Sequence, residues 1–145
     1  MKGIVIYDSW TGNTKKIAEA VASVNRFDIF KVNEAPLDLR QYDILVLGSP
    51  DINASFSKAT LEFIDNVLLP KRFALFITFG APFWGQISSL ICFNKIHSLL
   101  TKKGSLCKGK FMCPGFHAKF KTYKGRPCEI EINKAKIFAR KILGA

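Results

Sequence analysis

Short apolar runs alternate with amphipathic segments along this chain, and this alternation limits its possible folds more than any other feature. The runs at 3–7, 42–48, 73–78 and 106–113 are predicted to be buried inner strands. The run at 27–32 alternates apolar and polar residues, which indicates a more exposed, edge-like strand. Buried strands that are covered on both faces are typical of a parallel sheet with helices on its two sides. We therefore expect an α/β fold.

The segments between these strands have the apolar spacing of helices. Apolar residues recur every three or four positions within 13–23, 57–69 and 87–101, and Asn133 is expected to cap a last helix. Strands and helices thus alternate throughout, and from this alternation we expect five of each, one helix more than the four segments named here. No repeat or long linker interrupts residues 1–145, so a single domain is predicted.

The chain is strongly basic, with 22 Lys and Arg against 11 Asp and Glu and a net charge of +11. Residues 73–145 carry the whole excess, because residues 1–72 are balanced. Nine cations with no carboxylate among them make up a predicted basic face: Lys95, Lys102, Lys103, Lys108, Lys110, Lys119, Lys121, Lys124 and Arg126. Such a face favours an anionic partner, whereas a merely solubilising surface is the alternative.

The cysteines and the hydropathy of the chain indicate the cellular compartment that we expect. The four cysteines have neither CxxC nor zinc-like spacing, and the N-terminus carries no secretory signal, so reduced thiols in a cytoplasmic protein are expected. Residues 73–94 lack any charge, but Gly80, Pro82 and Gly85 interrupt them. A strand, a loop and a helix are therefore predicted there rather than a membrane helix. Neither histidine has a partner at metal-ligand spacing, so no metal site is expected.

The loop after the first strand has the composition of a phosphate site. Ligands bind at the carboxyl ends of strands in open α/β sheets, and the backbone N–H groups of a helix N-terminus attract phosphate. The residues concerned are Ser9, Trp10, Thr11, Gly12, Asn13 and Thr14. A helix cap at Thr11 or Asn13 needs only one such polar side chain, whereas this loop has four and a glycine, so we favour phosphate.

The sequence Ser9-x-Thr11-Gly12-Asn13-Thr14 resembles the Ser/Thr-x-Thr-Gly-Asn-Thr loop of the flavodoxin family. The order of elements and the length of the chain also resemble those of short-chain flavodoxins. The resemblance implies a flavodoxin-like, doubly wound, five-stranded parallel sheet of order 2-1-3-4-5 with helices on both faces. It also implies that this loop wraps the phosphate of FMN without a positively charged side chain.

The resemblance implies a second FMN-binding loop after the third strand, formed by Ser49, Pro50, Asp51, Ile52 and Asn53. In flavodoxins this loop often holds an aromatic side chain against the flavin and has a glycine in its turn. Here the nearest aromatic residue is Phe56 and the turn has no glycine, so the chain departs from the family pattern. An ordinary connection between a strand and a helix is the alternative.

A third loop is implied after the fourth strand, where flavodoxins cradle the pyrimidine end of the flavin with backbone N–H groups. Its residues are Thr78, Phe79, Gly80, Ala81, Phe83, Trp84 and Gly85. Gly80 permits close approach of the backbone, and Phe83 or Trp84 is expected to stack on the flavin ring. Packing of both aromatic side chains on the protein core is the alternative.

The resemblance implies electron transfer by bound FMN, in which no side chain acts as acid, base or nucleophile. Typical flavodoxins are acidic, so the basic face sets this chain apart and favours a redox protein partner with an acidic docking surface. Cations and aromatic residues also alternate at 119–124, which suits nucleic acid, but we consider that partner less favoured. No membrane partner is expected.

Two other classes of function stay open. One is a small FMN-dependent oxidoreductase that turns over with NAD(P)H or a quinone, or a flavodoxin-like activator of ribonucleotide reductase. The other is a flavin-free binding module that uses the basic face. Turnover with a nicotinamide or quinone would indicate the first, and salt-dependent binding of nucleic acid without flavin would indicate the second.

Overall fold

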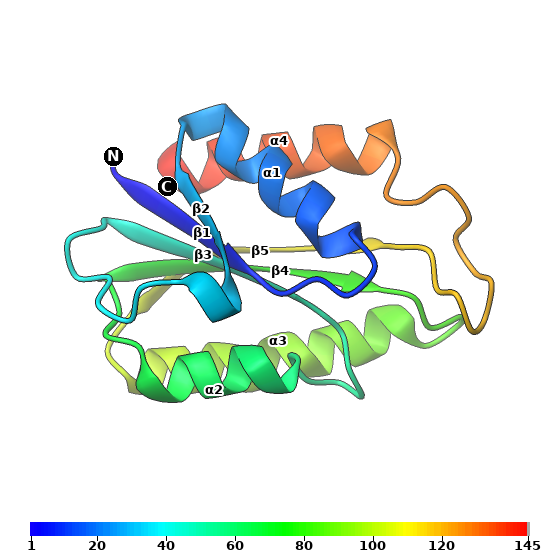
Figure 1. The fold of residues 1–145 in the computed structure, drawn as a ribbon, viewed down its shortest axis with the longest axis horizontal. Coiled ribbons are helices and arrows are strands. Elements are labelled where there is room, and N and C mark those ends of the chain that lie inside the picture. Colours follow the sequence, from blue (N-terminus) through cyan, green and yellow to red (C-terminus); the bar gives the residue numbers. More distant parts are fainter. Residues whose placement is uncertain (145) are drawn as a thin grey trace.

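One five-stranded, all-parallel sheet forms the centre of the computed structural model, which describes residues 1–144 (Figure 1). The strands lie in the order β2-β1-β3-β4-β5, which confirms the predicted order. Their bounds are β1 (Gly3–Tyr7), β2 (Asp28–Lys31), β3 (Ile44–Pro50), β4 (Arg72–Phe79) and β5 (Leu106–Pro114).

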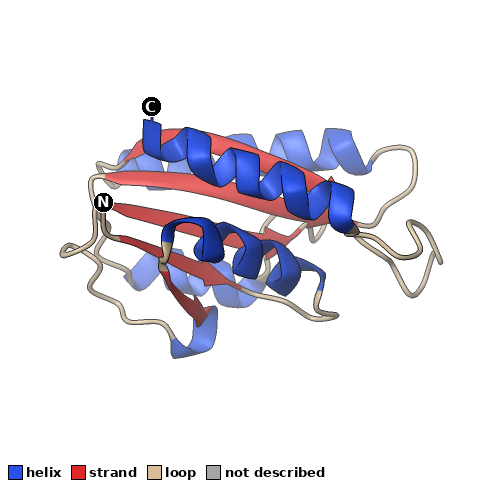
Figure 2. Ribbon diagram, turned by 90° about the horizontal axis from the view of Figure 1, so that it is seen from above, coloured by secondary structure: helices blue, strands red, loops and turns tan. Residues whose placement is uncertain are grey.

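Helices cover the two faces of the sheet in pairs (Figure 1, Figure 2). The helices α1 (Asn13–Asn25) and α4 (Glu129–Gly144) lie on one face. The helices α2 (Lys58–Asn66) and α3 (Gly85–Lys102) lie on the other. None of the helices within residues 1–144 combines the length and the hydropathy that crossing a bilayer requires.

The structure corrects the predicted number of helices, because residues 1–144 form four α-helices and not five. Between β2 and β3 the chain makes only a single 3-10 turn at Val32–Glu34. The backbone that follows pairs with the segment after α2: the Leu39 N–H donates to the Leu68 carbonyl at 2.9 Å, and the Leu68 N–H donates to the Leu37 carbonyl at 2.7 Å. These bonds hold 37–39 extended, so no helix forms there.

The start of α4 also differs from the prediction, because the helix begins at Glu129 and not beyond Asn133. Glu131 supplies the reason. Its carboxylate accepts the N–H of Cys128 at 2.7 Å, as the third residue of a capping box accepts the N–H of the cap. Glu131 is almost fully buried and also accepts two hydrogen bonds from the Arg126 guanidinium.

Alternate residues of the inner strands enter two separate apolar layers. Leu45 and Leu47 of β3 belong to the layer that includes Ile96 of α3. Val46, between them in the sequence, belongs to the layer that includes Ile17 of α1. All five side chains are fully buried, which explains why β3 appears as a continuous apolar run.

The two outer strands are less buried. β2 is short and mostly exposed, as predicted for an edge strand. β5 differs from the predicted inner strand, because within residues 1–144 it pairs with β4 alone and forms the opposite edge. Its Phe111 and Met112 pack against the two apolar layers, which explains the apolar pattern. A register shift between β4 and β5 leaves Lys108 without a partner on β4, and Lys110 is exposed.

The carboxyl ends of β1, β3, β4 and β5 point toward one end of the molecule, where the loops that follow them gather (Figure 1). The start of the chain and the end of α4 lie at the opposite end of the molecule (Figure 1). The parallel sheet therefore brings four loops that are far apart in the sequence to one place.

Candidate functional site

A hollow of about 300 Å³, here called the main hollow, lies among these four loops. It is lined by Trp10, Thr11, Asn13, Thr14, Pro50, Asp51, Ile52, Thr78, Phe79, Gly80, Gly115, Phe116, His117, Ala118 and Lys119. A second hollow of about 330 Å³, the side hollow, shares five of these residues with the main hollow: Asp51, Ile52, Phe79, Gly80 and His117. The sequence predicts the first three loops of this site, and the fourth loop is a finding of the structure.

The loop after β1 presents hydrogen-bond donors at the start of α1. Gly12 turns the chain in the left-handed conformation, with φ of 92°. Ser9 Oγ accepts the N–H groups of Gly12 at 3.1 Å and Lys15 at 3.3 Å, so its own hydroxyl hydrogen stays free to donate. Within residues 1–144, the N–H groups of Thr11, Asn13 and Thr14 in this turn have no protein acceptor. Together with the positive end of the α1 dipole, this donor set fits a phosphate group.

Two side chains of this loop tie it to other loops. The Thr14 hydroxyl lies 2.8 Å from the Thr78 hydroxyl at the end of β4, and both residues are almost fully buried. Only one of the two can donate in that bond, so one hydroxyl hydrogen remains for another acceptor. Asn13 Nδ2 donates to the Phe116 carbonyl at 2.9 Å. The loops after β1, β4 and β5 are therefore joined around the main hollow.

Trp10, at the variable position of this loop, is exposed and lines the main hollow. Its indole N–H donates to Asp8 Oδ2 at 3.3 Å. The Asp8 carboxylate is therefore engaged with the indole.

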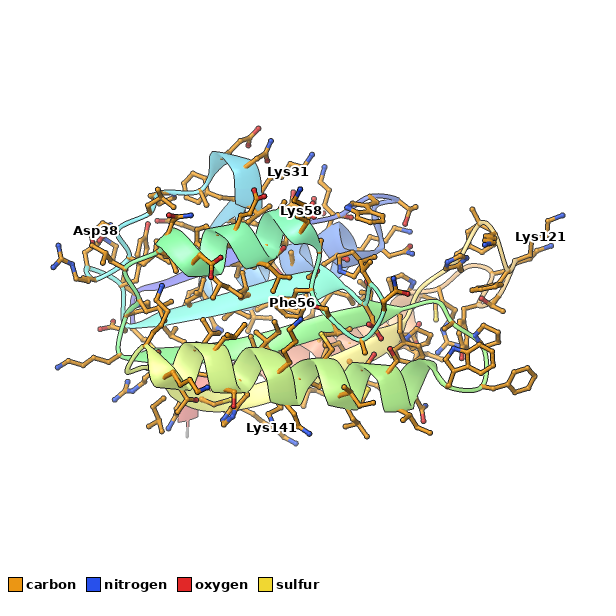
Figure 3. The ribbon with its side chains drawn as sticks, turned by 90° about the horizontal axis from the view of Figure 1, so that it is seen from below. Lys31, Asp38, Phe56, Lys58, Lys121 and Lys141 are labelled. Carbon is orange, nitrogen blue, oxygen red and sulfur yellow. The ribbon has the colours of Figure 1, made fainter. Side chains whose placement is uncertain are left out.

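The loop after β3 lines the main hollow with aliphatic side chains. Pro50 and Ile52 are part of the lining, whereas Phe56 is 2% exposed and belongs to the core (Figure 3). Ser49 is fully buried and does not line either hollow; its Oγ donates to the Pro50 carbonyl and accepts the Ser57 N–H. An aromatic ring on this side of the site is thus missing from the β3 loop, as its sequence indicates.

The same loop contains a tight turn without glycine. Ile52 and Ser55 exchange two backbone hydrogen bonds of 2.8 and 3.1 Å around Asn53 and Ala54. Both central residues have positive φ values, 52° and 61°. Asp51 Oδ1 stabilises the turn by accepting the Ala54 N–H at 2.9 Å. Left-handed backbone at alanine is strained by about 1–2 kcal/mol, so this turn is held by its surroundings.

Helix α3 supplies those surroundings. Ser89 Oγ donates to Asp51 Oδ2 at 3.3 Å. Lys95 Nζ donates to Ser55 Oγ at 2.9 Å. Both ends of the turn are therefore anchored to the same helix.

The loop after β4 requires glycine at position 80. A Cβ atom on Gly80 would lie 2.6 Å from the Cβ of His117, and the Gly80 carbonyl accepts the Thr122 hydroxyl at 2.6 Å. Gly85 is needed for packing, because a Cβ there would lie 2.6 Å from the ring of Phe79. Both glycines allow close approach between neighbouring segments.

The two aromatic residues of this loop point outward. Phe83 is 94% exposed and lines neither hollow. Trp84 is about half exposed and lines the side hollow together with Ala81 and Asn53. The aromatic side chains that line the main hollow are instead those of Trp10, Phe79, Phe116 and His117.

His117, which the sequence analysis left outside the site, lines both hollows. Its Nδ1 accepts the Phe120 N–H at 3.1 Å, and its ring stacks on that of Phe120 at 4.5 Å between centroids. The neutral ring therefore carries its hydrogen on Nε2, which is a hydrogen-bond donor. The rule that ligands bind beyond strand ends, applied to the fifth strand as it was to the others, is the signal that finds this loop.

Comparison with known families identifies the chain. A family model described as a flavodoxin domain matches residues 4–136. The chain belongs to the flavodoxin family. Membership of this family explains both the order of the strands in the sheet and the sequence of the loop at Gly12.

This flavodoxin-family chain is similar to proteins of other organisms along most of its length. It is 32% identical to the uncharacterized protein MJ0298 of Methanocaldococcus jannaschii, with 99% of each protein covered. It is 39% identical to the flavodoxin-like domain-containing protein BilS of Clostridioides difficile, over 79% of this chain and 66% of BilS. The structure of Fusobacterium nucleatum flavodoxin bound to flavin mononucleotide superimposes with a TM-score of 0.74 at 14% identity. The match covers 99% of this chain and 98% of that chain, and it shows that the two share a fold.

The nine cations of the predicted basic face lie in several parts of this flavodoxin-family fold. Lys102 and Lys103 are at the end of α3 remote from the hollows, and Lys108 and Lys110 are on β5. Lys119, Lys121 and Lys124 are on the loop between β5 and α4, from which Lys121 extends outward (Figure 3). Three of the nine are held by other groups: Lys95 by Ser55, Lys103 by the carbonyls of Ile64 and Val67, and Arg126 by Glu131.

Two of the thiols of this flavodoxin-family chain are unreactive. Burial raises the pKa of the Cys113 thiol to about 12, and the charge of Glu131 adds to the effect. Burial, with the charge of Asp51, raises the pKa of Cys92 to about 12 as well. Because only the thiolate is a nucleophile, neither residue acts as a redox thiol at neutral pH.

Proposed function

We propose that this chain binds FMN in the main and side hollows and carries electrons between that flavin and a protein partner. The observation that carries the proposal is the turn at Gly12, where N–H groups without a protein acceptor meet at the start of α1 beside the main hollow. A phosphate ester fits this donor set. Membership of the flavodoxin family and the FMN-bound flavodoxin of Fusobacterium nucleatum support the assignment.

Different loops of the site have different roles in this proposal. The N–H groups of Thr11, Asn13 and Thr14, with the Ser9 hydroxyl, hold the phosphate. The aliphatic side chains of Pro50 and Ile52 cover part of the flat ring, and the N–H on His117 Nε2 faces a polar edge. When bound, FMN supplies the electron-transfer chemistry, and the protein binds and orients it.

The first test is an absorbance spectrum of the purified chain before and after addition of FMN. A flavin band that co-elutes with the protein in gel filtration is the expected result. Fluorescence titration then gives the dissociation constant. A chain that carries no flavin and binds none on addition contradicts the proposal and leaves a flavin-free binding module as the better interpretation.

The second test concerns what the loaded protein reacts with. Stopped-flow mixing with a reduced plant-type ferredoxin, a small acidic iron–sulfur protein, measures electron transfer from a protein. Steady-state assays with NADPH and a benzoquinone measure turnover of small substrates. Fast reaction with the ferredoxin and slow turnover of NADPH and quinone is expected for an electron carrier, whereas the reverse pattern indicates a small FMN-dependent oxidoreductase.

A further inference from the structure

Five large apolar side chains beside the site are exposed to solvent. They are Phe83 (94% exposed), Trp84 (56%), Ile87 (63%), Leu90 (52%) and Ile91 (55%), and together they are here called the apolar patch. All five lie within nine consecutive residues that end the β4 loop and begin α3. Single exposed apolar residues are ordinary, but several gathered on one surface mark an interaction site.

The spacing of the patch shows that it lies on one side of α3. Ile87, Leu90 and Ile91 are three and four positions apart, which places them on one face of a helix. The opposite face of α3 is already buried against the sheet, through Cys92, Phe93 and other core residues. A helix that is apolar on both faces is normally covered on both, so the outer face at the start of α3 lacks a partner within residues 1–144.

The charges around the apolar patch are of one sign. From residue 66 to residue 128 the sequence has 11 Lys and Arg and no carboxylate. Three of these cations, Lys119, Lys121 and Lys124, are on the loop between β5 and α4, which lies at the same end of the molecule as the start of α3 (Figure 1). Phe120, between them, lines the side hollow together with Trp84. The apolar patch and the cationic loop thus meet at the mouth of the site.

We propose that the apolar patch and the lysines of the 115–127 loop form the docking surface for a partner protein with an apolar centre and carboxylates at its edge. The apolar centre removes the five side chains from water, and the carboxylates complement the lysines. This inference rests on the proposed function in one respect, that the partner is a redox protein. Because Trp84 belongs to both the patch and the side hollow, a protein seated here lies next to the flavin site.

Two other occupants fit the surface less well. A second copy of this chain would bring two sets of lysines together, and each copy carries a net charge of +11. Helices that lie on anionic membranes carry rows of Lys or Arg on their own polar face. In α3 the face opposite the apolar patch is an apolar face buried in the core, and the helix has only two cations, Lys95 and Lys102. The separation of apolar helix and cationic loop favours a protein surface.

The test uses the full chain labelled with ¹⁵N and two synthetic amphipathic helical peptides with the same leucine face. One peptide has Glu and the other has Lys on its polar face. We expect the Glu peptide to shift the amide resonances of 83–91 and of the 115–127 loop and to bind at least about tenfold more tightly than the Lys peptide. Equal binding of the two peptides, or shifts confined to other surfaces, would overturn the proposal.

Variants with matched controls locate the surface. Combined replacement of Ile87, Leu90 and Ile91 by Ser is expected to weaken the Glu peptide at least about tenfold. The control is Ile130→Ser with Ile137→Ser, two exposed residues of α4, which leaves the affinity unchanged. Combined reversal of Lys119, Lys121 and Lys124 to Glu makes the Lys peptide the tighter ligand, whereas the same reversal of Lys134, Arg140 and Lys141 on α4 does not. Thermal unfolding confirms that each variant is folded.

Two further measurements separate the other occupants and the proposed function. Flotation measures binding to vesicles of equal parts phosphatidylcholine and phosphatidylserine. The proposal is overturned if the wild type binds these vesicles but neither peptide, and if replacement of Ile87, Leu90 and Ile91 by Ser abolishes the vesicle binding. Analytical ultracentrifugation measures the oligomeric state. The proposal is also overturned if the wild type dimerises and the variant with Ser at 87, 90 and 91 does not. FMN titration of the wild type and of the variant with Ile87, Leu90 and Ile91 replaced by Ser tests the flavin site separately, because these three residues line neither hollow. Peptide binding without FMN binding refutes the flavin site and leaves the docking surface standing.

Discussion

The hydroxyl groups of Thr14 and Thr78 lie 2.8 Å apart, and they join the first turn of α1 to the end of β4 beside the main hollow. Replacing Thr14 by Val leaves the buried Thr78 hydroxyl without its partner. We expect the free energy of unfolding to fall by about 1–3 kcal/mol. The double variant Thr14→Val with Thr78→Val should cost less than the sum of the two single variants. Urea unfolding of all four proteins measures this, and strict additivity would show that the bond contributes nothing.

Gly12→Asp should abolish FMN binding, because a carboxylate would enter the turn that we propose as the phosphate site. The backbone strain of the change is controlled by Gly104→Asp, since Gly104 has a φ of 94° and, like Gly12, open space around a Cβ position. Gly104 lies after α3, remote from the hollows. Fluorescence titration should therefore show at least about a hundredfold weaker FMN binding for the first variant and none of this loss for the second. Equal affinity of both variants for FMN would place the phosphate elsewhere.

Gly80→Ala should displace the fourth loop, because the new Cβ would lie 2.6 Å from the Cβ of His117. We expect FMN to bind at least about tenfold more weakly as a result. The effect depends on His117, so the same change made in a His117→Gly background should cost little further affinity. Titration of the wild type, the two single variants and the double variant tests this. An equal loss in both backgrounds would show that Gly80 acts directly on the flavin.

The buried carboxylate of Glu131 makes stability depend on acid. Burial alone would raise its pKa, but hydrogen bonds from Arg126 and from the Cys128 N–H outweigh burial and lower the pKa to about 2 from an ordinary 4.5. A pKa lowered by folding stabilises the protein above the ordinary value, and that contribution is lost as the pH falls from 4.5 toward 2.

Glu131→Gln should therefore lower the free energy of unfolding at pH 7 by about 1.5–3 kcal/mol and reduce its fall in acid. Chemical denaturation at several pH values between 2 and 7 measures both quantities. The control is Glu129→Gln, at the exposed start of the same helix. A difference between wild type and Glu131→Gln that is the same at every pH would show that ionisation of Glu131 is not its source.

The inner strands and the turn at Gly12 could be predicted because their local sequence agrees with their environment. β3 is apolar on both faces because both faces are covered, and Gly12 stands where the chain needs a positive φ. Apolar patterning therefore predicts the sheet, and the composition of the β1 loop indicates the strand end at which a ligand is expected.

Two of the features that the sequence did not predict depend on contacts between residues far apart in the chain, and a third depends on a short-range contact at the start of a helix. Positive φ at Ala54 is unusual for alanine and is held by Asp51, which α3 anchors through Ser89. The placement of His117 depends on the absence of a side chain at Gly80, on a different strand end. The early start of α4 depends on Glu131 reaching back to Cys128. None of these pairs leaves a periodic signal in the sequence.

The outer edge of β5 has a consequence for the behaviour of the protein in concentrated solution. An exposed strand edge offers unpaired N–H and C=O groups on which a strand from a neighbouring molecule can add, and such addition leads to fibrils. The register shift at Lys108 interrupts the regular spacing of these groups, and Lys110 places an ammonium group beside them. A neighbouring strand would have to bury that charge, so the chain is protected against edge-to-edge aggregation at β5.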